Sequence, residues 1–297
     1  MSTPPAVLSR CLNVARAMPQ IVLFGDSITQ QSFNPELHGW GTIVCNYYAR
    51  RADVLNRGYS GYTTRWAVPA LPHIFHSEGQ RRNVKLVTVF FGANDSCIKA
   101  YNPRHHVPLH TYYNNVASTV QWLKDNVGGG GTGGGGGDDD DDLRIVLITP
   151  PPFHKDSFLV YQKNRYQDLA TGISERRNAV TKLYVDVVVS LGEKFDVPVL
   201  NLWERMMTER PGRWETFLSD GLHFSRDGNE FVGEQLLGLI ETSFPELKVT
   251  PSLLGGYSNS GSASEMGHSL DWHDQVTDTS FEFIDDDDRK KKKRKER

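Results

Sequence analysis

The sequence predicts an α/β fold: a flavodoxin-like three-layer α/β/α sandwich with a five-stranded parallel sheet. Short apolar runs, typical of buried strands, alternate with longer segments in which apolar residues recur at helical spacing. This alternation favours a parallel sheet, because each crossover between parallel strands uses a helix that covers one face. Polar residues suited to chemistry follow several of the strands, which is where such sheets place their sites.

The five predicted strands are short, and several stop at glycine or proline. They span residues 21–24, 53–56, 84–91, 143–148 and 197–201. Pro198 predicts an edge position for the fifth strand, because proline cannot donate a ladder hydrogen bond. Predicted helices cover 39–51, 111–126, 173–195, 203–217 with a break at Pro211, and 227–242, and another helix follows the glycine-punctuated loop 57–66.

The chain is organised as one folded domain with low-complexity additions. We expect a polar leader at 1–20, the folded domain at 21–250 and a disordered tail at 251–297 that ends in an acidic and then a basic run. Within the domain, residues 128–142 are mostly glycines followed by five aspartates. Such a segment cannot bury apolar surface, so we expect an extended surface loop.

Charge and cysteine content narrow the class of protein. The aspartate run and the segment 285–297 account for −5 and +3 of the net charge of −3, so the rest carries −1. A near-neutral body gives no reason to expect nucleic-acid binding. Three widely spaced cysteines argue against a disulfide framework and favour a reducing compartment. With no apolar run long enough to span a bilayer and no secretory signal, we expect a cytoplasmic protein.

The polar residues that follow the strands match an acyl-transfer site. Ser27 follows the first strand, Gly61 the second and Asn94 the third, while Asp220 and His223 precede the last helix. A serine becomes a nucleophile when a histidine takes its proton, and a carboxylate orients that histidine. A glycine N–H and an asparagine amide are suitable donors for the oxyanion. The alternative is local structure: Asp26 or Ser27 caps a helix, and Gly61 and Asn94 form turns.

Four blocks in this order resemble the SGNH (GDSL-type) family of esterases and lipases. The blocks are Gly25-Asp26-Ser27, Gly61, Gly92-Ala93-Asn94-Asp95 and Asp220-Gly221-Leu222-His223, and the resemblance covers about 21–244. Six short sequence motifs resemble in particular those of isoamyl-acetate-hydrolysing esterases: Phe24 to Gln30, Arg57 to Tyr62, Thr64 to Ala67, Phe90 to Asp95, Thr149 to Pro152 and Leu218 to His223.

The resemblance implies a role for each of these residues. Ser27 is the nucleophile, His223 the base and Asp220 its partner, while Gly61, Asn94 and the Ser27 N–H form the oxyanion hole. Gly58 is a competing candidate for the backbone donor. The implied activity is hydrolysis of short-chain, acetate-type esters of small alcohols through an acyl-enzyme, with no cofactor and no metal. The partner is then a small ester substrate.

Other functions remain open from the sequence. The same residues would serve a carbohydrate deacetylase or a lysophospholipase, because specificity resides in the shape of the pocket. A different class is a non-catalytic interaction protein directed by the basic run 289–295, which is compatible with a nuclear address or an acidic-surface contact. His105, His106 and His110 lie in a polar loop without the carboxylate or cysteine ligands that a zinc site would add, so we expect a solvated loop there and not a metal site. The oligomeric state cannot be read from the sequence.

Overall fold

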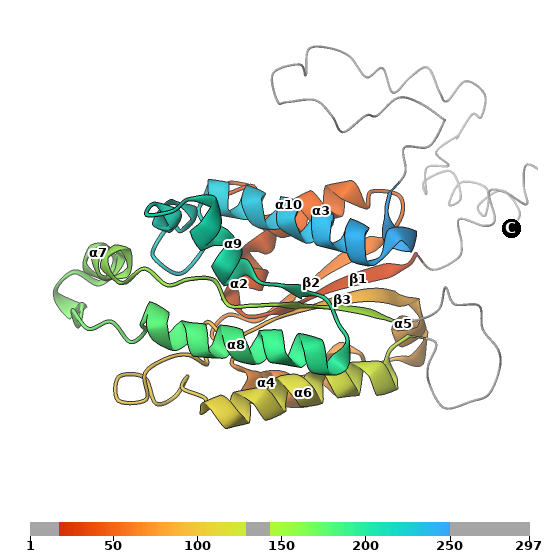
Figure 1. Cartoon of the computed structure of the whole chain (residues 1–297), viewed down its shortest axis with the longest axis horizontal. Helices are drawn as coiled ribbons and strands as arrows, with labels where there is room; N and C mark the ends of the chain where they lie inside the picture. Colours follow the sequence, from red (N-terminus) through yellow and green to blue (C-terminus); the bar gives the residue numbers. More distant parts are fainter. Residues whose placement is uncertain (1–17, 129–142, 250–297) are drawn as a thin grey trace, which may run out of the picture. The chain divides into compact units, whose positions relative to one another are not determined.

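The structure is a computed structural model, which describes residues 18–128 and 143–249. Its sheet has five parallel strands in the order β2-β1-β3-β4-β5, with helices on both faces (Figure 1). This is the flavodoxin-like order, so the predicted fold class is confirmed. Most of the leader, nearly all of the insert and the tail lie outside the described residues, and the expectations made for them stay predictions.

The five strands fall where the sequence predicts them. They are β1 (Gln20–Gly25), β2 (Asp53–Gly58), β3 (Val84–Phe90), β4 (Arg144–Ile148) and β5 (Val199–Leu200). β5 lies at one edge, as Pro198 predicts, and β1 lies between β2 and β3. At the end of β1, Gly25 pairs with Gly58 on one side and with Phe90 on the other. The chain that follows these three strands therefore emerges at one edge of the sheet.

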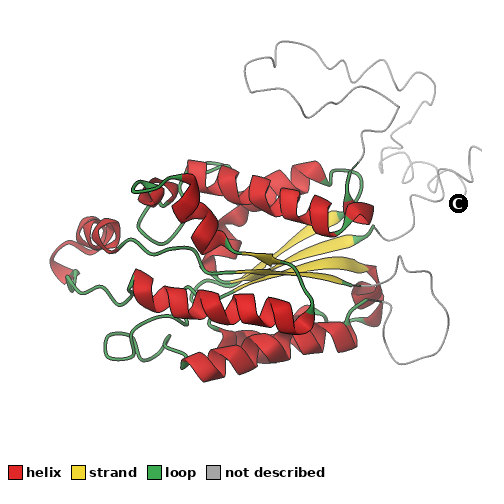
Figure 2. Cartoon of the chain, in the orientation of Figure 1, coloured by secondary structure: helices red, strands yellow, loops and turns green. Residues whose placement is uncertain are grey.

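Two hydrophobic cores hold the helical layers against the sheet. Ile21 and Leu23 of β1 belong to one core, and Val22 and Phe24 belong to the other. Successive strand side chains point to opposite faces, so one apolar strand supplies both cores. On one side lie α3 (Trp40–Tyr47), α9 (Leu202–Glu209) and α10 (Arg226–Ser243); on the other lie α4 (Thr64–Ile74), α6 (Leu109–Asn126) and α8 (Asn178–Phe195), as Figure 2 shows.

The helix prediction is wrong in three places. α8 begins at Asn178 instead of 173, because the Glu175 carbonyl accepts the Ile98 N–H (2.8 Å) and the Arg176 side chain turns inward. Two helices are missing from the prediction: α5 (Glu78–Asn83), which has no buried residue, and α7 (Lys155–Tyr166), which buries only Phe158. The break predicted at Pro211 is confirmed, because the segment 203–217 divides there into α9 and a 3₁₀ turn, Trp214–Phe217. Helices that bury little apolar surface leave little periodicity to detect.

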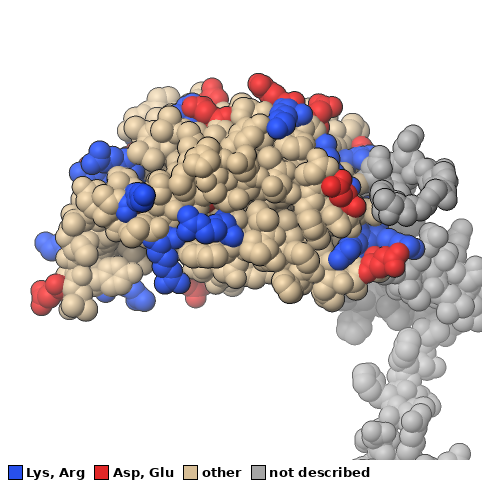
Figure 3. Space-filling model, turned by 90° about the horizontal axis from the view of Figure 1, so that it is seen from below, with Lys and Arg blue, Asp and Glu red and all other residues tan. Residues whose placement is uncertain are grey.

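Short elements complete the described part. α2 (Ser27–Gln30) follows β1, and further 3₁₀ turns cover Gln31–Phe33, Gln167–Leu169 and Pro245–Leu247. On the face drawn in Figure 3, basic and acidic side chains are interspersed with wide uncharged areas. None of the helices within the described ranges is long and apolar enough to cross a membrane.

Candidate active site

Ser27 lies directly after the central strand, at the start of a short helix. Asp26 is the N-cap of α2, and its Oδ1 accepts the Ile28 N–H at 2.9 Å. Asp26 therefore does the capping, and the Ser27 side chain is free for another partner. The Ser27 Oγ lies 2.9 Å from Nε2 of His223, a residue 196 positions further along the chain. Ser27 is 8% exposed, so this hydrogen bond is largely shielded from water.

His223 is held by Asp220 in the loop before α10. Oδ2 of Asp220 lies 2.7 Å from Nδ1 of His223. The other oxygen, Oδ1, accepts the backbone N–H groups of Leu222 (2.9 Å) and His223 (2.7 Å). A backbone hydrogen bond from Ser219 to the His223 carbonyl (2.8 Å) closes the same turn. The spacing of three residues thus folds the loop so that one carboxylate holds both the backbone and the ring of the histidine.

The charge of Asp220 defines the direction of the hydrogen bonds. Burial by itself would raise the pKa of Asp220, but the hydrogen bonds and the nearby His223 ring outweigh it and lower that pKa overall. An ionised carboxylate only accepts hydrogen bonds, so Nδ1 of His223 carries the hydrogen. Nε2 then accepts from the Ser27 hydroxyl, which is the arrangement that a general base needs.

Three N–H donors near Ser27 have no acceptor among the described residues. They are the backbone N–H groups of Ser27 and Gly61 and one hydrogen of the Asn94 amide, whose other hydrogen bonds the Tyr62 carbonyl at 2.9 Å. Ser27, Gly61 and Asn94 follow β1, β2 and β3, which are adjacent in the sheet. Gly61 has a φ of +77°, a turn conformation that glycine adopts without strain. Donors available in this way suit a developing negative charge.

Gly58, the competing candidate for the backbone donor, is occupied in two ways. Its N–H donates to Oδ1 of Asn56 at 2.9 Å. A Cβ at this position would lie 1.9 Å from the backbone nitrogen of Gln30, so the close approach of β2 to α2 requires glycine. Gly58 therefore has a packing role, and the geometry favours Gly61 as the donor.

Two carboxyl groups are buried beside the site, and the sequence pattern gave no functional reason to single them out. Asp95 is fully buried, and its Oδ1 accepts both the N–H (2.9 Å) and the hydroxyl (2.5 Å) of Thr64. Burial raises the pKa of Asp95 to about 7 and that of Asp26 to about 6, although hydrogen bonds partly oppose the effect in both. Oδ2 of each carboxyl has no hydrogen-bond partner among the described residues.

Arg176 is a second residue that the sequence pattern does not single out. It falls inside the predicted helix 173–195, where an arginine is unremarkable. In the structure it belongs to the loop before α8, is 4% exposed and donates from Nη2 to Oδ1 of Asn94 at 2.9 Å. The sequence carries no local signal for this contact, because it does not show that α8 begins only at Asn178, two residues after Arg176.

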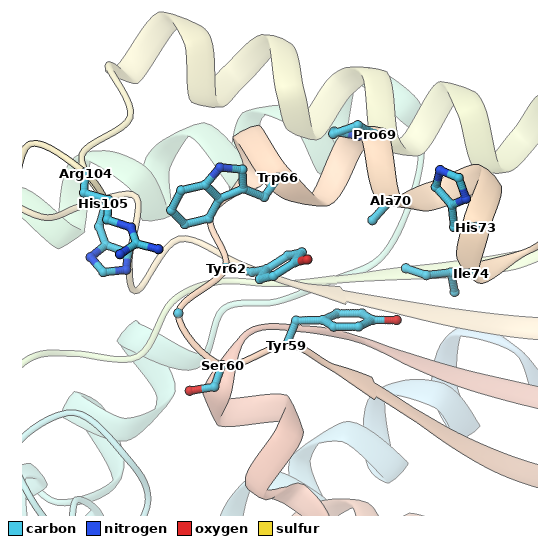
Figure 4. Close-up of a pocket in the computed structure, with 11 residues that line it drawn as sticks. Tyr59, Ser60, Tyr62, Trp66, Pro69, Ala70, His73, Ile74, Arg104 and His105 are labelled. Carbon is cyan, nitrogen blue, oxygen red and sulfur yellow. The ribbon is translucent and has the colours of Figure 1, made fainter.

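A groove of about 740 Å³ adjoins the site at Gly61 (Figure 4). Its wall is aromatic: Tyr59 and Tyr62 stack with ring centroids 5.0 Å apart, and the Trp66 ring lies nearby. Arg104 lies over the Trp66 ring at 5.8 Å. Ser60 and Gly61 line the groove, whereas Ser27 and His223 do not.

The remaining candidate residues lie elsewhere or are engaged locally. His105 lines the groove, and its Nδ1 hydrogen-bonds Asn102 at 3.0 Å. Nδ1 of His106 lies 2.7 Å from the Cys97 carbonyl oxygen, and His110 is exposed on α6. In the described ranges, no three histidine, cysteine or carboxylate side chains form a group that could hold a metal ion.

The fold and the comparison with known sequences together define the class of protein. Residues 21–236 match the family described as GDSL-like Lipase/Acylhydrolase, and the chain belongs to this family. Its members are carboxylic ester hydrolases, and this chain is accordingly an esterase or acylhydrolase.

Individual relatives are similar over most of their length. The chain is 40% identical over 220 residues to a GDSL esterase/lipase of Arabidopsis thaliana, covering 73% of this chain and 84% of that protein. It is 37% identical to the human isoamyl acetate-hydrolyzing esterase 1 homolog (77% and 84% covered) and 31% identical to the isoamyl acetate-hydrolyzing esterase of Saccharomyces cerevisiae (76% and 88%). Among solved structures, a lipase/acylhydrolase from Enterococcus faecalis aligns with a TM-score of 0.54 at 26% identity, covering 76% of this chain and 97% of that one.

Proposed function

We propose that this chain is a serine esterase in which Ser27 is the nucleophile, His223 the general base and Asp220 the partner of the histidine. The observation that carries the proposal is the continuous hydrogen-bond chain from Ser27 Oγ through the His223 ring to Asp220. As Ser27 Oγ attacks the ester carbonyl carbon, Nε2 takes the hydroxyl proton and the imidazolium is stabilised by the Asp220 carboxylate.

The tetrahedral intermediate then collapses to an acyl-enzyme. Its oxyanion receives hydrogen bonds from the donors without other acceptors, the Ser27 and Gly61 N–H groups and the Asn94 amide. His223 returns the proton to the departing alcohol oxygen, and the C–O bond breaks. Water repeats the sequence: His223 takes a proton from water, hydroxide adds to the acyl carbon, and the serine leaves with the proton restored. The products are one carboxylic acid and one alcohol.

For the substrate we propose short-chain, acetate-type esters of small alcohols. The support is the similarity to relatives named as isoamyl acetate-hydrolyzing esterases, over about three quarters of this chain. The domain that carries the activity is proposed to be 21–250, with the family match at 21–236 as its support.

One observation favours a second candidate, a carbohydrate deacetylase. Tyr59, Tyr62 and Trp66 line the groove beside Gly61, and aromatic side chains of this kind offer apolar surface that packs against sugar rings. The acetyl group would lie at Ser27 and the sugar in the groove. The two candidates share their chemistry and differ only in what the groove accepts.

A substrate panel tests these proposals. Steady-state hydrolysis is measured for p-nitrophenyl acetate, butyrate and octanoate, for isoamyl acetate and for an acetylated xylo-oligosaccharide, with the Ser27→Ala variant as control. Highest kcat/KM on the acetates of small alcohols supports the first candidate. Preference for the acetylated sugar supports the second, and highest activity on the octanoate contradicts both. A Ser27→Ala variant with most of the wild-type activity would remove Ser27 from the mechanism.

A further inference from the structure

A buried arginine lies behind the amide of Asn94. Arg176 belongs to the loop that precedes α8, and only 4% of it is exposed. We propose that Arg176 is a positioning residue, which fixes the orientation of the Asn94 amide so that its NH₂ group faces the oxyanion. The inference rests on the proposed esterase mechanism, because it assigns Arg176 a task only through the role of Asn94.

The direction of the hydrogen bonds dictates this orientation. Nη2 of Arg176 donates to Oδ1 of Asn94 at 2.9 Å, and Nε donates to the neighbouring carbonyl of Ala93 at 2.9 Å. A guanidinium has donors and no acceptor, so only the oxygen of the amide can face it. The NH₂ group must then point the other way, where one hydrogen bonds the Tyr62 carbonyl and the second is available. A flipped amide would set NH₂ against the guanidinium and oxygen against the Tyr62 carbonyl.

The guanidinium is itself held in a fixed place. Nη1 bonds Oε1 of Glu175 at 2.5 Å, and the Phe158 ring centroid lies 5.9 Å from the guanidinium carbon. Oε2 of Glu175 in turn accepts from Asn102 at 2.7 Å. The Ser174 hydroxyl bonds the Arg176 carbonyl at 2.8 Å, which stabilises the backbone of the loop. The contacts of its guanidinium and of its backbone carbonyl leave Arg176 little freedom to move. The Asn94 amide that it contacts is therefore oriented before any substrate binds.

The charge of Arg176 also reaches the site. Burial raises the pKa of Asp26, and the Arg176 charge is among the groups that partly oppose that rise. A hydrogen bond from an ionised donor is stronger than a neutral one and polarises the group that accepts it. The Asn94 amide is therefore a better donor with Arg176 on its oxygen. Burying an arginine is costly unless it is hydrogen-bonded, and here each of the three guanidinium nitrogens donates a hydrogen bond.

The test is a double-mutant cycle in the full-length protein. The variants are Arg176→Met, Arg176→Lys, Asn94→Ala and the two corresponding double variants, with Arg177→Met as matched control, because Arg177 is the exposed neighbour. We expect Arg176→Met to lower kcat between about tenfold and a hundredfold, approaching the loss of an oxyanion donor, with KM changed less than about threefold. Arg176→Lys keeps the charge but not the fork of donors, so it should recover part of the loss.

The interaction between the two sites is the decisive readout. In the Asn94→Ala background, either substitution of Arg176 should cost less than about threefold in kcat, because no amide is left to orient. The proposal is overturned if Arg176→Met keeps wild-type kcat, or if the full loss persists without Asn94. If Arg176→Met does not fold, the smaller loss expected in Arg176→Lys must still disappear in the Asn94→Ala background, and a loss that persists there overturns the proposal. Failure of the proposed function looks different: Asn94→Ala would then leave kcat unchanged.

Discussion

Replacing Asp220 by asparagine should reverse the hydrogen bond that prepares His223. In the wild type, Oδ1 of Asp220 accepts two backbone N–H groups and Oδ2 faces Nδ1 of His223. In Asp220→Asn the amide oxygen should stay with the two backbone donors, because the opposite orientation would leave both without an acceptor. That cost is about 1–3 kcal/mol for each buried donor. The NH₂ group then faces Nδ1, which must become an acceptor.

The reversal changes the tautomer of the histidine and so removes its basicity toward serine. With Nδ1 accepting, Nε2 carries the hydrogen and can only donate to Ser27 Oγ. The equivalent substitution in a serine protease triad lowers kcat about 10⁴-fold by this route. We expect a loss of the same order here, which corresponds to about 5 kcal/mol of transition-state free energy. The free energy of unfolding should change little, because Asp220→Asn keeps both backbone hydrogen bonds.

The assay is steady-state hydrolysis of p-nitrophenyl acetate beside a thermal melt. Asp227→Asn is the matched control: its carboxylate is exposed and pairs with Arg210 at 3.0 Å, not with a residue of the site. We predict a large fall in kcat for Asp220→Asn, near wild-type kcat for Asp227→Asn, and similar melting temperatures for the two variants and the wild type. If Asp220→Asn retains more than about a tenth of the wild-type kcat, the assigned orientation of His223 is refuted.

Two further predictions concern stability and the insert. The folded-state pKa of Asp95, about 7, lies above the unfolded value, so its contribution to stability is complete below about pH 4 and is lost as the pH rises through 7. The free energy of unfolding of Asp95→Asn, measured with denaturant, should therefore rise relative to that of the wild type as the pH increases from 4 to 8. A difference between the two proteins that stays constant over this range would disprove the pKa shift. The insert 128–142 joins α6 to β4 at the edge where strands begin, since Gly128 donates to Arg81 before β3. That edge is roughly 17–20 Å from Ser27 at the other end of β1, so a short turn in its place should leave kcat/KM nearly unchanged, whereas a tenfold loss would contradict this placement.

The strands and the order of the site residues could be predicted from the sequence because both depend on local patterns. Apolar runs such as 21–24 signal burial wherever they occur, and a parallel sheet places the residues after its strands at one edge. The prediction that Ser27, Asp220 and His223 meet needed only this rule and the chemistry of each side chain. The hydrogen bonds among them agree with that prediction.

The parts that could not be predicted depend on tertiary contacts. Arg176 resembles any polar residue near a helix start until the fold brings Asn94 beside it, 82 positions away. The choice between Gly58 and Gly61 depended on the approach of Gln30 to β2, which has no local signature. α7 buries a single side chain, so its sequence carries almost no helical periodicity.

Labelling by a fluorophosphonate distinguishes an activated Ser27 from an inert one. Such a probe phosphonylates only a serine activated by its base, and mass spectrometry of the digested protein locates the adduct. We predict one adduct per chain, on the peptide that contains Ser27, formed in the wild type and absent from Ser27→Ala. We also predict that His223→Ala slows the labelling by orders of magnitude. An adduct on another serine, or labelling that persists in Ser27→Ala, would show that Ser27 is not the nucleophile.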